Sequence, residues 1–279
     1  MAQRTWLITG ISSGFGRTMT EELLARGDRV AGTVRKASAV DDLRSKYGSL
    51  LWVAQLDVTN TSAVHEVVNR AFEDLGRIEV VVNNAGYGLF GAAEELTDEE
   101  ITLQINTNLI GSIQIVRAAL PHLRAQGGGR VIQLSTYGGQ ATHPGASLYH
   151  ASKWGIEGFI DSTSKEVAPF NIGMTIIEPG GARTDFRFGS SKLSTPMEVY
   201  TGTPASMVRG IRDASHPSPG DPRKMVKIMI DSVDQNPAPL RIALGADSYT
   251  MIHKALSDRL ASLEAQKDVA FSTDFTTEL

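Results

Sequence analysis

The sequence predicts an α/β protein built on a doubly wound parallel sheet of seven strands. Seven short β-rich runs are apolar on both faces, as a parallel sheet covered by helices on each side requires. Helical patterns lie between these runs, and the alternation of strand and helix favours right-handed crossovers. With 279 residues, of which 41% are hydrophobic, the chain can bury a large core.

The predicted elements follow one another in chain order. The strands are expected at residues 5–9, 29–34, 50–55, 80–84, 130–135, 173–178 and 240–244. The helices are expected at residues 15–26, 38–46, 61–75, 98–126, 148–168, 222–235 and 247–266. One helix has a clear start signal, because Thr97 is followed three positions later by Glu100, as in a capping box.

One region interrupts this alternation. Residues 186–220 contain Gly, Ser and Pro throughout and include one predicted short helix at 204–213. A long irregular insertion in a compact domain is usually a functional loop or a mobile segment. We therefore expect one domain over residues 1–279, with a substrate-binding lid inserted at 186–220.

Composition and charge exclude several classes of protein. The chain has 27 Lys and Arg against 31 Asp and Glu, a net charge of -4, so no bulk positive field attracts nucleic acid or anionic lipid. It has no cysteine, which excludes a disulfide framework and a Cys-based zinc site. His143 and His150 have no partners at ligand-like spacing, so no metal is expected. Without a signal peptide or an apolar run near the ~20 residues of a membrane span, we expect a soluble, cytoplasmic protein.

A glycine-rich turn follows the first predicted strand. The stretch "TGISSGFG" places Gly10, Gly14 and Gly16 between that strand and the next helix. Glycines let the backbone approach a pyrophosphate, and a helix N-terminus offers free N–H groups and a favourable dipole. The spacing is not the G-x-G-x-x-G of the common dinucleotide fingerprint, so a tight turn that simply needs glycine stays an alternative.

The ends of the next two strands bear on the choice of cofactor. Where an NAD-binding protein usually has an acidic residue, the second strand ends in "GTVRK". The planar guanidinium of Arg35 can hold a 2′-phosphate by two hydrogen bonds, which favours NADPH. A solvated basic pair, Arg35 and Lys36, is the alternative. Asp57 lies at the carboxyl edge of the third strand, where ligands of such sheets gather.

A tyrosine and a lysine share one face of a predicted helix. Tyr149 and Lys153 are four positions apart, and no other tyrosine of the chain has a lysine at that offset. An unperturbed tyrosine has a pKa of about 10 and is a poor acid–base group at neutral pH. A cation about 4 Å away, at an effective dielectric near 20, favours phenolate by roughly 4 kcal/mol, or about three pKa units. The pair therefore predicts an acid–base centre.

Several motifs together resemble the short-chain dehydrogenase/reductase family. The stretches "TGISSGFG", "NNAG", "NTNLIG", "LST", "YHASK" and "EPGGARTDF" occur in the family's order over residues 5–186, and "LRIALG" is similar to its final strand. The resemblance implies a single Rossmann-like domain and a nicotinamide cofactor, here NADPH/NADP. It also implies a catalytic set of Asn, Ser, Tyr and Lys.

The resemblance assigns roles residue by residue. Tyr149 is the acid–base residue, Lys153 lowers its pKa and holds the nicotinamide ribose, and Asn108 supports a water-linked proton relay. With Thr136, these residues form the expected catalytic set. The expected cofactor-binding residues are Gly10, Ser12, Ser13, Gly14, Phe15, Gly16, Arg35, Asp57, Val58, Asn84, Ala85, Gly86, Tyr149, Lys153, Pro179, Gly180 and Thr184.

The sequence departs from the family's pattern at the catalytic serine. The family has this serine thirteen positions before the tyrosine, where this chain has Thr136, and Ser135 is one position too early. Neighbours on an extended strand face opposite sides, so only one hydroxyl can face the nicotinamide. Thr136 keeps the required donor and acceptor, while its methyl group restricts χ1. We predict Thr136, and an insertion in the following loop, which would restore the register to Ser135, is the alternative.

The predicted reaction is hydride transfer from NADPH to the carbonyl carbon of a hydrophobic ketone or aldehyde, with Tyr149 giving the proton. Leu89, Phe90, residues 137–144 and the lid form the expected, mostly apolar pocket wall. Carbonyl reductases and hydroxysteroid- or retinol-dehydrogenase-like members are the most similar branches. The alternatives are an NAD-dependent alcohol dehydrogenase and a non-catalytic nucleotide-binding sensor. By analogy with the family, we expect a homodimer or homotetramer packed through the helices near 102–126 and 148–168.

Overall fold

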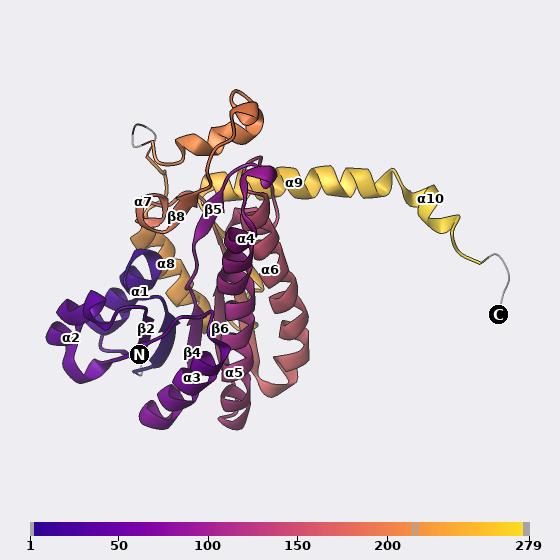
Figure 1. Cartoon of the computed structure of the whole chain (residues 1–279). Helices are drawn as coiled ribbons and strands as arrows, with labels where there is room; N and C mark the ends of the chain where they lie inside the picture. Colours follow the sequence, from indigo (N-terminus) through magenta and orange to yellow (C-terminus); the bar gives the residue numbers. More distant parts are fainter. Residues whose placement is uncertain (1–2, 214, 216, 276–279) are drawn as a thin grey trace.

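The computed structural model describes residues 3–213, 215 and 217–275. Residues 1, 2, 214, 216 and 276–279, which the predicted domain and lid include, lie outside this description. Seven parallel strands form one sheet in the order β3-β2-β1-β4-β6-β7-β9 (Figure 1), so the predicted doubly wound, Rossmann-like sheet is confirmed. The strands are β1 Thr5–Thr9, β2 Arg29–Val34, β3 Leu51–Gln55, β4 Val80–Asn83, β6 Gly129–Leu134, β7 Ile172–Pro179 and β9 Arg241–Leu244.

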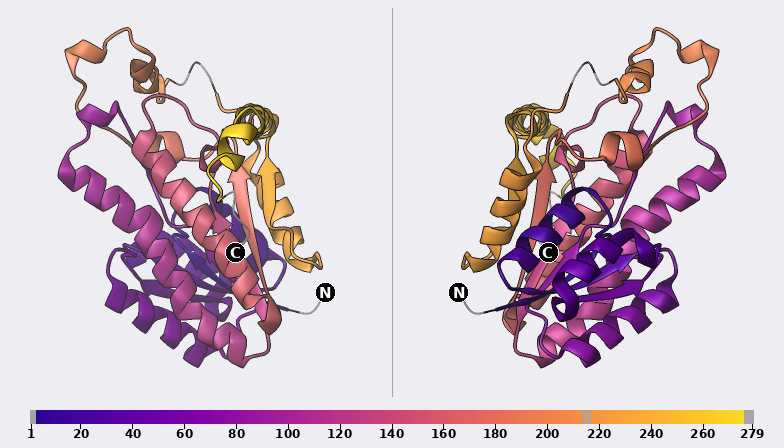
Figure 2. Two further views of the ribbon diagram at one scale, coloured as in Figure 1. Left: turned by 90° about the vertical axis from the view of Figure 1, so that its right-hand side faces the viewer. Right: turned by 90° about the vertical axis from the view of Figure 1, so that its left-hand side faces the viewer.

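Helices cover both faces of the sheet (Figure 2). One face carries α3 Thr61–Leu75, α5 Gly111–Ala125 and α6 Ser147–Val167, and the other carries α1 Gly14–Ala25, α2 Asp41–Tyr47 and α8 Pro222–Asp231. Alternate strand residues enter opposite cores: Leu7 packs under the first set of helices, and Trp6 and Ile8 pack under the second. The strand order reverses between β1 and β4, which is where such sheets bind ligands.

The helix predicted at 98–126 is not continuous. The structure has α4 Asp98–Ile105, a π-helical turn at Asn106–Ile110, and then α5. The capping box at its start is confirmed: the Thr97 Oγ1 accepts from the Glu100 N–H at 3.2 Å, and a Glu100 carboxylate oxygen accepts from the Thr97 N–H at 3.2 Å. A π-turn widens a helix locally and often marks a functional position, and this one contains Asn108.

Residues 186–220 contain short elements that the sequence did not predict. The strand β8 Ser191–Leu193 pairs in parallel with β5 Gly88–Phe90, forming a separate two-stranded sheet. The segment also has α7 Phe186–Gly189, and the helix expected at 204–213 is a 3-10 helix at Pro204–Gly210. Its end returns to the chain just before its start, because the Gly220 N–H donates to the Gly181 carbonyl at 2.8 Å.

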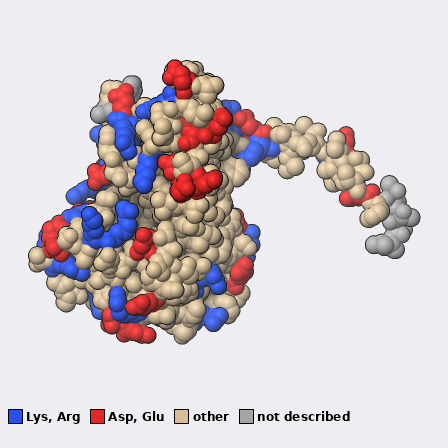
Figure 3. All heavy atoms as spheres, in the orientation of Figure 1, with Lys and Arg blue, Asp and Glu red and all other residues tan. Residues whose placement is uncertain are grey.

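The chain ends in two helices that leave the body of the molecule. Helix α9 Ala246–Glu264 begins beside the sheet, and α10 Lys267–Phe271, which was not predicted, lies beyond it on the projecting arm (Figure 1). On the face drawn in Figure 3, cationic and anionic side chains are interspersed. Among the described residues, no helix is both long enough and apolar enough to span a bilayer.

Candidate active site

A cavity of about 840 Å³ opens at the carboxyl ends of the central strands, with residues of the 186–220 segment in its wall. It is lined by almost all the predicted site residues, from the turn after β1 to Tyr149 and Lys153 on α6. Of the predicted residues, Gly16 and Asn108 are not among those lining it in the described part of the chain. The cofactor-binding role of Gly16 and the relay role of Asn108 stay predictions.

The glycine-rich turn brings an open helix end to the cavity. Gly10 has a φ of +74°, a left-handed conformation that favours glycine. A Cβ on Gly16 would lie 2.3 Å from the Gly10 carbonyl oxygen and 2.4 Å from the Asn84 Nδ2, so only glycine allows α1 to start this close to β1. Ser13, the N-cap residue of α1, makes no side-chain capping hydrogen bond. The first N–H groups of α1 therefore suit an anion.

Asn84 fixes this turn from the end of β4. Its Nδ2 donates to the carbonyl oxygens of Thr9 at 2.8 Å and Gly10 at 3.0 Å. The backbone N–H groups of Asn84 and Ala85 both donate to the Thr9 Oγ1 at 3.0 Å. The side chain of Asn84 thus supports the shape of the turn; Asn84 also lines the cavity, and its contact with a cofactor stays a prediction.

Arg35 and Asp57 lie at one end of the cavity. Arg35 is exposed at the end of β2 and lines the cavity. Asp57 accepts hydrogen bonds from the Thr59 N–H at 3.0 Å and Thr59 Oγ1 at 2.7 Å, which lower its pKa, and the charge of Arg35 lowers it further. Asp57 is the one acidic residue among the described residues that line the cavity.

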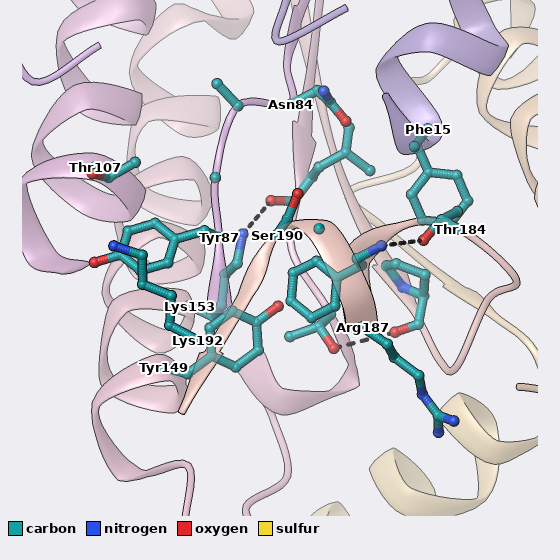
Figure 4. Close-up of a pocket in the computed structure, with 18 of the residues that line it drawn as sticks. Phe15, Asn84, Tyr87, Thr107, Tyr149, Lys153, Thr184, Arg187, Ser190 and Lys192 are labelled. Atoms are coloured by element: carbon teal, nitrogen blue, oxygen red, sulfur yellow. Dashed lines mark hydrogen bonds between the residues drawn. The ribbon is translucent and has the colours of Figure 1, made fainter. Parts of the chain in front are cut away.

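Tyr149 and Lys153 lie side by side at the centre of the site (Figure 4). The Lys153 Nζ is 5.9 Å from the Tyr149 ring centroid and donates to the Leu134 carbonyl at 3.0 Å. Burial lowers the pKa of Lys153 to about 8, against the opposing charge of Glu157. Burial also raises the pKa of Tyr149, with a contribution from Tyr137 in the same direction, while a hydrogen bond with Thr136 lowers it.

Burial raises the pKa of Tyr149 in the free protein, and the lowering of this pKa by Lys153 stays a prediction. The Lys153 ammonium lies beside the ring and donates to a backbone carbonyl. Burial disfavours the phenolate, so Tyr149 is a protonated phenol at neutral pH.

The two neighbouring hydroxyls point in different directions. Thr136 Oγ1 donates to the Pro179 carbonyl at 3.2 Å and hydrogen-bonds with Tyr149. Ser135 Oγ donates to the Glu157 Oε1 at 2.5 Å, on the other side of the chain. The structure therefore brings Thr136, and not the Ser135 hydroxyl, to Tyr149.

Asn108 ties the π-turn to the surrounding backbone. Its Oδ1 accepts from the Tyr87 N–H at 3.0 Å, and its Nδ2 donates to the Tyr87 carbonyl at 2.7 Å and to the Ser152 Oγ at 3.4 Å. Ser152 precedes Lys153 on α6. Asn108 thus connects the loop after β4 with the helix that carries the tyrosine and lysine.

The far wall of the cavity is largely aromatic and aliphatic. Phe90 and Phe186 contact Tyr149, with ring centroids 5.5 and 6.0 Å apart. Leu89, which was expected in this wall, is buried beneath it, and the expected stretch 137–144 contributes only part of its residues. The sequence also did not predict two cations that line the cavity, Arg187 and Lys192.

Comparisons with known proteins agree with this architecture. Residues 4–192 match the family model described as short chain dehydrogenase. The chain is 34% identical to Oxidoreductase BOA17 of Botryotinia fuckeliana (97% of this chain, 99% of that protein) and 33% identical to a 3-ketodihydrosphingosine reductase of Bacteroides thetaiotaomicron (90% and 91%). A solved short-chain dehydrogenase from Streptomyces avermitilis superposes with a TM-score of 0.91 at 36% identity, covering 99% of this chain and 100% of that one. The chain therefore belongs to the short-chain dehydrogenase family and is an oxidoreductase of that type.

Proposed function

We propose that the protein is an NADPH-dependent carbonyl reductase that transfers hydride to a hydrophobic ketone or aldehyde. The observation that carries the proposal is the contact between Tyr149 and the Thr136 hydroxyl, beside Lys153, in the wall of the cavity. A protonated phenol beside a second hydroxyl is suited to donate to a carbonyl oxygen. Burial raises the pKa of Tyr149, so the phenol holds its proton in the free protein, and the charge of Lys153 beside it would stabilise the phenolate that remains once the proton is given.

The residues present fit a nicotinamide dinucleotide phosphate. The uncapped start of α1 suits its pyrophosphate, and Gly16 allows the close approach of strand and helix that leaves room for it. Arg35 suits the 2′-phosphate, and Lys153 suits the nicotinamide ribose. When bound, NADPH supplies the hydride.

The protein's own groups would handle the oxygen of the substrate. The Thr136 hydroxyl would turn its hydrogen from the Pro179 carbonyl to the carbonyl oxygen of the substrate, where it would stabilise the negative charge that develops. The Tyr149 hydroxyl then donates its proton to that oxygen, so that an alcohol forms and a phenolate remains. Lys153 stabilises this phenolate. The hydrogen bond from Asn108 to Ser152 holds the helix that carries Lys153 in place while water returns a proton to the phenolate.

The wall of the cavity supports an apolar substrate. Phe90, Phe186, Val208 and Ile211 line the end of the cavity near Tyr149, and we propose that residues 186–220 act as a lid over the substrate. The relative at 33% identity named 3-ketodihydrosphingosine reductase supports a ketone as the substrate class.

The proposal is tested by following the oxidation of NADPH, and separately of NADH, by purified protein offered hydrophobic ketones and aldehydes. We expect turnover with NADPH in preference to NADH. Preference for NADH would instead favour the NAD-dependent alcohol dehydrogenase. Tight cofactor binding without turnover across the panel would favour a nucleotide-binding sensor and contradict the reductase.

Replacing Arg35 with alanine is expected to weaken NADPH binding by about 10- to 150-fold, because a hydrogen bond to a charged group contributes about 1.5–3 kcal/mol. NADH binding should change little. The matched control is Lys36→Ala, which removes an adjacent exposed cation that is not among the described residues lining the cavity. Titration of each variant with both cofactors checks this, and equal losses for NADPH and NADH would contradict the phosphate role.

We predict a homodimer or homotetramer, and exposed apolar side chains on the helices expected at the subunit contact support this prediction. Leu103 on α4, Ile110 in the π-turn and Trp154 on α6 are large apolar residues that are about two-fifths exposed (43%, 39% and 40%). They lie on the helices that the family resemblance assigns to subunit contacts.

A further inference from the structure

Two buried carboxyl groups lie behind the candidate site. Glu157 is on α6, one turn after Lys153, and Glu178 is on β7; they are 2% and 1% exposed. Ser135 Oγ donates to the Glu157 Oε1 at 2.5 Å, and the Gln140 Nε2 donates to the Glu178 Oε1 at 2.6 Å. Ser135 and Gln140 are the two ends of the segment that carries Thr136, so each end is attached to one of the carboxyl groups.

Arg241 is the guanidinium that lies nearest the two carboxyl groups, and it is closely bonded to neither of them. Arg241 Nε lies 3.6 Å from the Glu157 Oε2 and 3.5 Å from the Glu178 Oε1, while its guanidinium hydrogen-bonds Asp161 at 2.8 Å. The Glu157 Oε2 and the Arg241 Nε are both buried without a hydrogen-bond partner. Arg241 is thus shared among three acids, and burying an uncompensated carboxylate is costly.

The segment between Ser135 and Gln140 lies directly on these side chains. A Cβ on Gly139 would fall 1.7 Å from the Glu157 Oε1, and one on Gly138 would fall 2.5 Å from the His150 Nδ1. The two glycines therefore let the 3-10 turn at Tyr137–Gly139 rest against α6. A change in the protonation of Glu157 or Glu178 would therefore act directly on the backbone that carries Thr136.

We propose that Glu157 and Glu178 share one proton and, in that form, act as positioning residues that hold the segment Ser135–Gln140 with the Thr136 hydroxyl toward Tyr149. The Glu157 and Glu178 side chains hydrogen-bond each other and both lie within 3.6 Å of the Arg241 Nε. The shared proton would be the hydrogen of that bond, which joins α6, β7 and the segment in one network. The effect on turnover rests on the proposed function, whereas the shared proton does not.

The charged and polar neighbours of the pair bear on its protonation. Burial raises the pKa of Glu157 to about 8; the Ser135 hydrogen bond opposes this shift and the charge of Glu178 adds to it. Burial likewise raises the pKa of Glu178. The charged groups that face the pair are Lys153 and Asp161 on α6 and Arg241 on β9. The polar groups are Ser135, Gln140 and Ser248 on α9, whose hydroxyl donates to the backbone carbonyl of Glu178.

The sign of the pH effect follows from the raised pKa. The folded protein keeps a proton that the unfolded chain, with a glutamate pKa of 4.5, has lost. The stabilisation is therefore complete below about pH 4.5 and is lost as the pH rises toward about 8. One such proton changes the unfolding equilibrium constant by up to about tenfold per pH unit in this window.

The test compares the wild type with Glu157→Gln, which keeps the shape and the donor of the protonated acid but cannot ionise. Denaturant unfolding from pH 5 to pH 9 should show the wild type losing stability relative to Glu157→Gln as the pH rises. The control Glu166→Gln, at an exposed position on the same helix, should follow the wild type. Parallel curves for the wild type and Glu157→Gln would overturn the shared proton.

Two further measurements separate the parts of the proposal. Infrared absorption of a protonated carboxyl group should persist in the wild type at pH 6 to 7 and disappear near pH 9, a result that needs no folded variant. In the reductase assay, kcat of the wild type should fall more steeply above pH 8 than kcat of Glu157→Gln, with KM for NADPH unchanged. A stability difference without any turnover would retain the shared proton and contradict the reductase instead, and equal pH profiles of kcat would overturn the positioning role.

Discussion

Replacing Tyr149 with phenylalanine is expected to lower kcat by about 10²- to 10⁴-fold, the usual contribution of a positioned general acid. The substitution removes one hydroxyl and keeps the ring that packs against Phe90 and Phe186. The fold and the binding of NADPH should therefore survive. Steady-state kinetics with the best ketone, together with a cofactor titration, measure both effects.

The matched control for this variant is Tyr249→Phe. Tyr249 is 65% exposed on α9 and does not line the cavity in the described structure, so loss of its hydroxyl should leave kcat unchanged. Full activity in Tyr149→Phe would show that another group provides the proton. An equal loss in both variants would point to a general effect on the protein.

Replacing Thr136 with alanine is expected to lower kcat by about 10²- to 10³-fold, the effect of removing one hydrogen-bond donor to a developing oxyanion. Thr136→Ser keeps the hydroxyl and should recover most of the activity. The stability of Thr136→Ala should fall only modestly, because the two backbone bonds of its hydroxyl, to the Pro179 carbonyl at 3.2 Å and from the Gly138 N–H at 3.4 Å, are long.

The variant Ser135→Ala should lose stability and keep most of its activity. It leaves the buried Glu157 without its hydroxyl donor, which costs about 1–3 kcal/mol of unfolding free energy. Its kcat should fall far less than that of Thr136→Ala. Loss of turnover in Ser135→Ala with full activity in Thr136→Ala would reverse the assignment of the two hydroxyls.

The sheet could be predicted from the sequence because its strands are buried on both faces. Each predicted strand lies within two residues of the observed one, since an apolar run is visible in the chain itself. The pairing of β5 with β8 could not be predicted in this way. Each has three residues, and they are about a hundred positions apart, so neither strand has a local signal.

The site residues were predictable where a motif carries them, and their partners were not. Tyr149 and Lys153 follow from their spacing, but the burial that raises the pKa of Tyr149 depends on Phe90 and Phe186, which come from other parts of the chain. Glu157 did have a signal, because it continues the four-residue spacing of Tyr149 and Lys153 along one face of the helix. Its burial against β7 needs the tertiary structure.

The closure of the 186–220 segment on itself has a consequence for how this chain could change its specificity. Its start pairs with β5, its end meets Ala182 through Gly220, and its middle is held by Glu95, which accepts from the Met197 N–H at 2.9 Å. Because the ends are joined to each other, a longer or shorter insert between them adds little loop-closure entropy to folding. If the segment is the lid proposed above, it is an exchangeable module: evolution or an engineer could replace it to recognise a new substrate while Tyr149 and the sheet stay as they are.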